Sequence, residues 1–441
     1  MKIPFVAFCL AVSCRLATGQ NPIARPGVYI ADPSARVWDD GNLYVYGSLD
    51  ESTSHYCSER YHVLSTSDLM SWKTAENAFS STGENDQVDY SDAVLYAPDC
   101  QYKNGKYYLY YCQPERNAAE GVAVGDAPNG PFKGGRRIPL AGIEEIDPAV
   151  FIDDDGQAYY IWGQFRAKVA KLRPNMTEID PSTIVNDIVT ESAHHFHEGS
   201  FMVKRKGIYY LVYADVSRGS RPTCLGYSTS DSPMGPFNYG GVIIDNDHCD
   251  PGNWNNHGSI VEYRGQWYVF YHRSTHGSRM MRKACVEPIS FNDDGSIDEV
   301  EMTSQGAGPP LDAFETIGAE RACLLFGNSR IELFERGTEK IAGIENGDSV
   351  AYKYVDFKKG ASEVELRIRP LENGGILVVR LDQPWGPIVA VVAVSGEENA
   401  DWKTVGCKMK HAEGIHAVWL SFHGKNDRML ELDSFSFRRL E

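Results

Sequence analysis

The run Ile208-Tyr209-Tyr210-Leu211-Val212-Tyr213 is rich in aromatic and aliphatic residues and follows a tight turn at Gly207. It ends the segment 198–214, in which an approach strand, a glycine turn and an aromatic strand follow one another. The same plan recurs in four more segments: 32–47, 97–112, 147–163 and 257–272. The turn glycines of the five segments are Gly41, Gly105, Gly156, Gly207 and Gly265.

The spacing of these glycines predicts the fold. They lie 64, 51, 51 and 58 residues apart, and a β-hairpin repeated five times at such a period is typical of a five-bladed β-propeller. A β-sandwich would not normally repeat so regularly. Helical patterns are scarce, and 441 residues with 42% hydrophobic content suffice for two domains with a core each. We therefore predict an all-β chain, with the propeller over residues 20–312 and a second domain over residues 313–441.

The boundary between the two domains is expected at Gly306-Ala307-Gly308-Pro309-Pro310, which follows a long β-rich region. Glycine and proline in such density are typical of a linker or a domain edge. The alternative is an ordinary surface loop inside one domain.

The first nineteen residues predict a secretory signal peptide. Lys2 precedes the apolar stretch 3–12, and Ala17-Thr18-Gly19 supplies small residues for cleavage before Gln20. The apolar stretch is too short to cross a bilayer. A buried N-terminal helix is the alternative, but the pattern favours a secreted, extracellular protein.

Eight cysteines remain after that cleavage: Cys57, Cys100, Cys112, Cys224, Cys249, Cys285, Cys323 and Cys407. None of them shows the close pairwise spacing of a zinc site, and an oxidising compartment favours disulfides among some of them. Asn175-Met176-Thr177 is an acceptable N-glycosylation sequon, which is compatible with secretion.

The charge of the chain indicates its partners. A formal net charge of −17 without a basic run argues against nucleic acid and anionic membranes, and a neutral polysaccharide or oligosaccharide suits the protein better. We expect a monomer that needs no organic cofactor.

Three acids share one position in the repeat. Asp32, Asp147 and Glu198 each lie nine residues before a turn glycine. Equivalent positions near the starts of the innermost strands of a propeller converge on its axis, so the three carboxylates should face one funnel. Converging like charges raise at least one pKa, which allows a protonated acid to lie beside an ionised base. The alternative is that the Asp-Pro pairs only open strands.

The motifs around these acids resemble those of glycoside hydrolase family 43. The matching segments are Ile30-Ala31-Asp32-Pro33-Ser34, Tyr96-Ala97-Pro98-Asp99, Glu145-Ile146-Asp147-Pro148-Ala149, His197-Glu198-Gly199-Ser200 and Trp254-Asn255-Asn256-His257-Gly258-Ser259. The resemblance covers roughly residues 21–312. It implies a five-bladed propeller with Asp32 as general base, Glu198 as general acid and Asp147 as the residue that orients Glu198 and tunes its pKa.

The resemblance also implies roles for His257 and Arg282. His257 matches a histidine that points into the central channel and often helps to hold a calcium ion, commonly through waters; a hydrogen-bonded structural histidine is the alternative. Arg282 lies where an arginine of related enzymes touches the sugar, and an exposed arginine is its alternative. Tyr96 and Trp254 could stack on sugar rings, against the alternative of core packing.

Residues from about 315 to the end resemble a family 6 carbohydrate-binding module, which implies a β-sandwich of the jelly-roll type. The matching motifs are Ile344–Tyr352, Tyr354–Phe357, Asn373–Ile376, Gly414–His416 and Leu432–Phe437. Ser349 departs from the pattern, because many members carry an aromatic residue there. Glu320 and Asp433 are the candidates for a structural calcium, and Trp402 is the candidate for a sugar contact. Sugar binding by this domain is therefore an open alternative to capping the propeller.

Two carboxylates on opposite sides of a pocket suffice for glycoside hydrolysis, because one protonates the leaving oxygen and the other activates water. We expect a secreted, inverting exo-glycosidase, an α-L-arabinofuranosidase or β-xylosidase acting on arabinoxylan or arabinan. A galactofuranosidase or galactanase of the same family is one alternative, and a non-catalytic sugar-binding propeller is another. The presence of all three acids favours catalysis. The loops 47–61 and 245–254 are expected to select the sugar.

Overall fold

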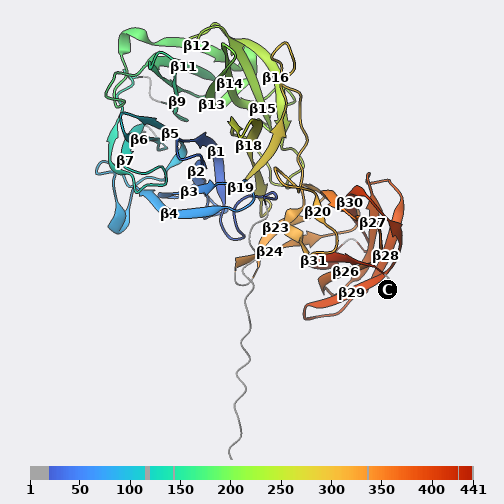
Figure 1. The fold of residues 1–441 in the computed structure, drawn as a ribbon. Coiled ribbons are helices and arrows are strands. Elements are labelled where there is room, and N and C mark those ends of the chain that lie inside the picture. Colours follow the sequence, from blue (N-terminus) through green and yellow to red (C-terminus); the bar gives the residue numbers. More distant parts are fainter. Residues whose placement is uncertain (1–18, 115–119, 143–144, 335–336, 426, 440–441) are drawn as a thin grey trace, which may run out of the picture.

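The computed structural model describes residues 19–114, 120–142, 145–334, 337–425 and 427–439. The predicted signal peptide, except for its last residue, lies outside the described residues. Five antiparallel sheets surround a central axis, and a two-sheet sandwich lies beside them (Figure 1). The predicted all-β architecture of a five-bladed propeller followed by a sandwich is confirmed. The one α-helix of the described residues, α1 (Glu191–His194), is a single turn, and η1 (Gly83–Asn85), η2 (Pro181–Thr183) and η3 (Ala319–Arg321) are short 3-10 turns.

Each of the first four blades is a sheet of four strands in sequence order. Blade one contains β1 (Ile30–Val37), β2 (Leu43–Leu49), β3 (Arg60–Thr66) and β4 (Lys73–Ser80). Blade two contains β5 (Tyr96–Lys103), β6 (Lys106–Cys112), β7 (Gly121–Gly125) and β8 (Lys133–Arg137). Blade three contains β9 (Ala149–Ile152), β10 (Ala158–Trp162), β11 (Arg166–Lys171) and β12 (Val185–Thr190). Blade four contains β13 (Phe196–Arg205), β14 (Ile208–Asp215), β15 (Cys224–Ser230) and β16 (Asn238–Asp245).

Blade five has three strands of its own, β17 (Ser259–Tyr263), β18 (Gln266–Thr275) and β19 (Ser278–Ile289). The chain before β1 lies along its outer strand. Ile23 N–H donates to the carbonyl of Ala284 at 3.0 Å, and the side chain of Asn21 pairs with the backbone of Val286 in both directions. The N-terminal segment thereby joins the last blade to the first and closes the ring.

The aromatic second strands explain how the blades pack. In β2 every residue is buried, because both faces of a blade are covered by its neighbours. Tyr46 of this strand belongs to the apolar layer between blades one and two, and Tyr160 of β10 belongs to the layer between blades two and three. The innermost strands of the five blades, β1, β5, β9, β13 and β17, contact one another around the axis. Residues at their starts therefore face one end of a shared channel.

The C-terminal domain consists of two packed sheets. The first contains β20 (Leu311–Asp312), β22 (Leu324–Phe326), β25 (Ser349–Asp356), β27 (Gly374–Leu381), β28 (Ile388–Ser395) and β30 (Ile415–His423). The second contains β21 (Ile317–Gly318), β23 (Arg330–Phe334), β24 (Thr338–Ile344), β26 (Ala361–Pro370), β29 (Lys403–Ala412) and β31 (Leu430–Arg438). One apolar core, which includes Leu366, Leu420 and Phe435, fills the space between the sheets. Because β20 pairs with β25, the sandwich begins two residues before the expected start at residue 313.

The two domains share buried surface. Cys323, Ala351 and Trp419 of the sandwich belong to the same apolar cluster as Tyr271 and Cys285 of blade five. In the segment 306–310, Gly306 N–H donates to Thr303 Oγ1 and Gly308 N–H donates to the carbonyl of Gln305. This predicted linker is thus a hydrogen-bonded turn at a packed junction.

The cysteines differ from the expectation. Disulfides were expected among some of the eight, but all eight are free thiols, and all of them except Cys407 are buried. The prediction of disulfides is wrong for this structure, in which the buried cysteines pack as small apolar residues. Among the described residues, no helix is both long and apolar enough to span a membrane.

Candidate active site

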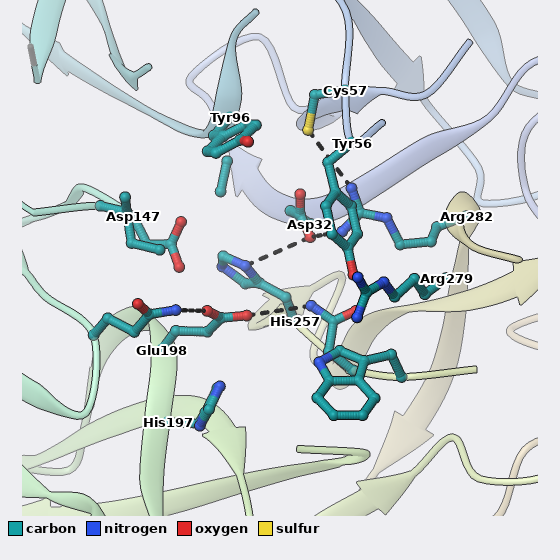
Figure 2. A pocket seen from close by; sticks show the side chains of 15 residues that line it. Asp32, Tyr56, Cys57, Tyr96, Asp147, His197, Glu198, His257, Arg279 and Arg282 are labelled. Carbon is teal, nitrogen blue, oxygen red and sulfur yellow. Dashed lines mark hydrogen bonds and ion pairs between the residues drawn. The ribbon is translucent and has the colours of Figure 1, made fainter. Parts of the chain in front are cut away.

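A pocket of about 240 Å³ opens at the end of the channel where the three acids lie (Figure 2). Its walls contain every propeller residue that the sequence singled out for function: Asp32, Tyr96, Asp147, Glu198, Trp254, His257 and Arg282. Asp147 and Glu198 lie on one side of the pocket, and Asp32 and Arg282 lie on the other (Figure 2). The predicted convergence of three blades on one site is therefore present in the structure.

Local irregularities aim the acids into the pocket. Strand β1 shifts its register between Ala31 and Ser34, and β13 does so on both sides of Glu198. Such bulges turn a side chain out of the alternation of a regular strand. Asp32 and Asp147 also have positive φ angles of 52° and 62°, a strained conformation that is common at functional sites. A proline follows each of these aspartates, as expected where regular strand pairing is interrupted.

Asp32 is buried and surrounded by donors. Arg282 Nη1 donates to its Oδ1 at 2.8 Å, and Ser48 Oγ donates to its Oδ2 at 2.7 Å. Burial by itself would raise the pKa of Asp32, but Arg282, His272 and His257 together hold that pKa well below the ordinary value. The carboxylate is therefore ionised at neutral pH, which is the state that a general base requires.

Arg282 is held by carboxylates. Its Nε and Nη2 donate to the two oxygens of Asp50 at 2.9 and 3.0 Å, while Nη1 reaches Asp32. Nη2 also lies 3.6 Å from the thiol of Cys57, so a single N–H of the guanidinium has no bond to these groups. Only 3% of its side chain is exposed. Arg282 lines the pocket as predicted, but its main contacts fix the base, and the alternative of an exposed arginine is wrong.

Asp147 holds a proton more tightly than an ordinary aspartate. Its backbone N–H donates to Cys112 Sγ at 3.3 Å, and its carboxyl lies across the pocket from Asp32. Burial raises the pKa of Asp147, and repulsion from Glu198 and Asp32 raises it further. The pocket therefore combines a carboxyl that ionises readily, Asp32, with one that keeps its proton to higher pH, Asp147.

Two side-chain amides hold Glu198. Gln164 Nε2 donates to its Oε2 at 2.8 Å, and Asn255 Nδ2 donates to its Oε1 at 3.2 Å. Gln164 is fixed in turn, because its backbone N–H donates to Glu145, which pairs with Lys168 at 2.6 Å. The sequence analysis did not single out Gln164. Its position directly after Trp162-Gly163, at the end of an aromatic strand, is the signal that was available.

His257 lies between the acid and the base. Its Nδ1 is 3.6 Å from Asp32 Oδ1, and its ring lies against Gly199, the residue after Glu198. Burial lowers the pKa of His257, although Asp32 and Glu198 oppose this effect. The described residues contain no group of three or more His, Cys, Asp or Glu side chains that could hold a metal ion. The direct neighbours of His257 do not form the oxygen-rich shell that calcium prefers, and calcium at this residue stays a prediction.

A second histidine, which the sequence analysis missed, connects the acid and the base. His272 is fully buried, and its Nε2 lies 3.0 Å from the carbonyl of Asn255. A carbonyl can only accept, so Nε2 carries the proton, and Nδ1 accepts the backbone N–H of Asp32 at 3.2 Å. The side chain of Asn255 reaches Glu198. One histidine and one asparagine thus link the backbone of the base to the carboxyl of the acid.

The rim of the pocket is aromatic and cationic. Trp254 is 39% exposed, so the alternative of core packing is wrong for this residue. The guanidinium of Arg279 lies 5.6 Å from the Trp254 ring and 5.8 Å from the Tyr56 ring. Tyr96 is half-buried, and burial raises its pKa to about 12. Tyr56 and Arg279, which the sequence analysis did not identify, widen the set of groups that can contact a sugar.

The ionised carboxylate of Asp32 thus faces the carboxyls of Asp147 and Glu198 across a pocket whose wall contains aromatic side chains. This arrangement can activate a water on one side of a bound sugar and protonate a leaving oxygen on the other. Comparison with known proteins identifies the same chemistry. The family described as "Glycosyl hydrolases family 43" matches residues 20–297.

The chain belongs to glycosyl hydrolase family 43. It is therefore a glycoside hydrolase that acts on O-glycosyl compounds and needs no organic cofactor. A second match, "Carbohydrate binding module (family 6)", covers residues 327–439 and confirms the resemblance of the sandwich.

Relatives of this family 43 enzyme match along most of its length. A "Xylosidase/arabinosidase" from Thermoclostridium stercorarium is 30% identical over 93% of this chain and 97% of its own. An "Arabinoxylan arabinofuranohydrolase" from Paenibacillus polymyxa is 27% identical over 92% of this chain and 72% of its own. The crystal structure of the family 43 arabinoxylan arabinofuranohydrolase from Bacillus subtilis, in complex with cellotetraose, is 25% identical, with a TM-score of 0.56 over 96% of this chain and 99% of its own.

The residues singled out in the sandwich have other partners. Asp433 accepts a hydrogen bond from Arg367 at 3.0 Å, and Glu320 lies 3.7 Å from Arg321. Strand β21 ends two residues before Glu320 and pairs with β31, which carries Asp433, but the described residues contain no group of three or more His, Cys, Asp or Glu side chains that could hold a metal ion. Trp402 packs against Phe334, with ring centroids 4.9 Å apart, and lies beside two arginine side chains. Calcium at these two acids and a sugar contact of Trp402 therefore stay predictions.

Proposed function

We propose that this family 43 enzyme is a secreted, inverting exo-glycosidase that removes terminal α-L-arabinofuranosyl or β-xylosyl residues from arabinoxylan or arabinan. The observation that carries the proposal is the separation of roles within one small pocket. Arg282 holds Asp32 ionised on one side, and Asp147, whose pKa is raised, lies with Glu198 on the other. The names of the relatives, xylosidase, arabinosidase and arabinoxylan arabinofuranohydrolase, support this substrate class.

In the proposed mechanism the terminal sugar occupies the pocket with its anomeric carbon between Asp32 and Glu198. Asp32 removes a proton from a water that attacks the anomeric carbon, while Glu198 protonates the leaving oxygen. A base and an acid on opposite sides of the sugar, separated by roughly 6.5–9.5 Å, leave room for that water and give a single displacement with inversion. Gln164 and Asn255 hold Glu198 in position, and His272 does the same for the backbone of Asp32.

The sugar is identified by a panel of nitrophenyl glycosides followed by polymeric substrates. The proposal expects turnover of the α-L-arabinofuranoside or the β-xyloside and release of the same sugar from arabinoxylan or arabinan. Turnover of the galactofuranoside alone would favour the related alternative. Binding of oligosaccharides without any turnover would establish a non-catalytic propeller.

The stereochemistry has its own measurement. Proton NMR of the first product formed is expected to show the inverted anomeric configuration. Retention would mean a covalent intermediate and would overturn the roles of all three acids.

The proposal also includes secretion of the protein, a monomeric state and the binding of calcium. Mass spectrometry of the protein recovered from the medium should find an N-terminus at Gln20, and light scattering should give the mass of one chain. If calcium binds through His257, added calcium raises the melting temperature and a chelator lowers both that temperature and the activity. No response to either would leave His257 a structural residue.

A further inference from the structure

The outer wall of the pocket comes from two segments of blade five. Trp254 lies on the loop between β16 and β17, and Arg279 is the second residue of β19, directly after the β18–β19 turn. Both side chains are exposed at the rim, where the part of a substrate beyond the cleaved bond would lie. Blade four holds the loop in part, because Arg221 Nη1 donates to the carbonyl of Asn253 at 2.8 Å, and the sandwich contacts both segments.

The β18–β19 turn is bound to an edge strand of the sandwich. His276 N–H donates to the carbonyl of Ile331 at 2.7 Å, and Leu333 N–H donates to His276 Nε2 at 3.1 Å. Strand β23, which carries Ile331 and Leu333, is the outermost strand of its sheet, so one edge has backbone groups that no other strand uses. The turn occupies that edge.

The loop of Trp254 is bound to the sandwich as well. Leu325 N–H donates to the carbonyl of His248 at 2.7 Å, and the rings of His248 and Phe326 lie 4.6 Å apart. The loop and the turn are also tied to each other, because Asp250 Oδ2 accepts the backbone N–H of Gly277 at 3.2 Å. Both segments of the pocket wall are thus bound to the sandwich.

A buried ion pair joins blade five to the sandwich next to these contacts. Lys283 follows Arg282 in β19, and its Nζ lies 2.7 Å from both carboxylate oxygens of Glu339 in β24. The two side chains are 1% and 0% exposed. A buried pair of this kind strongly disfavours separation of the domains, because separation would leave each charge without its partner.

We propose that the sandwich of this enzyme is a positioning domain of the active site: it holds Trp254 and Arg279 in place and so determines how tightly the polymer chain is bound. Unsupported loops lose affinity and rate through the entropy of ordering them at each binding event. The sandwich removes that cost in advance by pairing with both loops. This role rests on the proposed function, which supplies the substrate. The contacts between the sandwich and the two segments do not depend on which sugar is cleaved.

Leu333→Pro tests the proposal in the full-length protein. Proline lacks the N–H that reaches His276, and it is tolerated on an edge strand where no ladder bond is lost. Leu333→Ala is the matched control, because it shortens the same exposed side chain and keeps the N–H. His276→Phe is the second variant, since it keeps a ring against Tyr29 and removes the acceptor.

Kinetics on two substrates give the first result. Leu333→Pro and His276→Phe should raise KM for arabinoxylan oligosaccharides about tenfold with kcat nearly kept, while a nitrophenyl glycoside and the alanine control change less than about twofold. A uniform fall of kcat on every substrate, together with a lower melting temperature, would mean a purely structural role and overturn the proposal. Unchanged kinetics in both variants would overturn it as well.

Hydrogen exchange gives a second result that needs no substrate. In the two variants, backbone amides of residues 246–257 and 275–282 should exchange faster, while the other four blades keep their protection. If the parent enzyme hydrolysed no glycoside, the proposed function would fail and this measurement would still decide the positioning role. Unaltered exchange in both segments would contradict it.

Discussion

At the scale of single residues, different neighbours give two chemically similar carboxyls of the site different affinities for a proton. Asp32 and Asp147 are both buried aspartates in the same strained conformation before a proline. Arg282 lowers the pKa of one, and Glu198 raises the pKa of the other. Environment, and not residue type, therefore assigns the roles.

Asp32→Asn should remove nearly all turnover and leave folding intact. An amide keeps the shape of the side chain but cannot take a proton from water, so kcat should fall on the order of 10² to 10⁴. Circular dichroism and the melting temperature verify that the variant is folded. Turnover within about tenfold of the parent would exclude Asp32 as the base.

Asp147→Ala should change how the rate depends on pH and on the leaving group of the substrate. Asp147 and Glu198 repel each other when both are ionised, and the substitution removes this repulsion, which favours a proton on their side of the pocket. The high-pH arm of the kcat/KM profile should move to lower pH, and glycosides with poor leaving groups should lose more rate than nitrophenyl glycosides. Equal losses on both substrate types and an unmoved arm would show that Asp147 does not act through proton supply.

At the scale of elements, the bulge of β13 brings the acid and His257 together. Gly199 follows Glu198 with a φ of 74°, and a Cβ at this position would lie 2.8–2.9 Å from ring atoms of His257. The innermost strand of blade four and the approach to blade five can be this close only because residue 199 lacks a side chain.

Gly199→Ala should therefore reduce activity as well as stability. A left-handed alanine costs about 1–2 kcal/mol wherever it occurs. Gly207→Ala is the matched control, since Gly207 has a φ of 84° but no atom within 4 Å of an added Cβ. Both variants should show lower midpoints of urea denaturation, and only Gly199→Ala should lose kcat, by more than about tenfold through displacement of Glu198. Equal activities of the two variants would contradict the role of this contact.

At the scale of the whole molecule, the propeller and the sandwich form one folded unit with buried acids near their junction. Burial raises the pKa of Asp250 and that of Glu287 to about 7 each. Glu287 lies beside Arg273, and Asp250 joins the Trp254 loop to the β18–β19 turn. In both cases the native state binds a proton that the unfolded chain has already released at the same pH.

This difference predicts how stability changes with pH. A carboxyl with a raised pKa in the folded state makes the free energy of unfolding fall as pH rises from about 4 to about 7. Asp250→Asn should reduce that slope without abolishing it, because Glu287 still contributes, and the surface variant Asp231→Asn should leave it unchanged. Urea denaturation across this pH range measures the slope. An undiminished slope in Asp250→Asn would mean that Asp250 is ionised in the folded protein.

The propeller and the position of the three acids could be predicted from the residue pattern. The repeat of a glycine turn and an aromatic strand is a local pattern, and the hairpin that it forms must bury both faces against other hairpins. Asp32, Asp147 and Glu198 share one register with the turn glycines, so closing the ring brings them together. That inference needed only the spacing of the repeat along the chain.

The tertiary structure alone decided which groups surround those acids. The partners of Arg282 are Asp50 and Asp32, 232 and 250 residues away, and Gln164 and His272 reach the acid and the base from other blades. Eight cysteines that the sequence presents as disulfide candidates are thiols. The sequence could not decide this, because disulfide formation depends on distances between cysteines that a linear pattern does not contain. The sandwich, which resembles a separate binding module in sequence, is joined to the active-site loops, because β23 leaves an edge that the β18–β19 turn can fill.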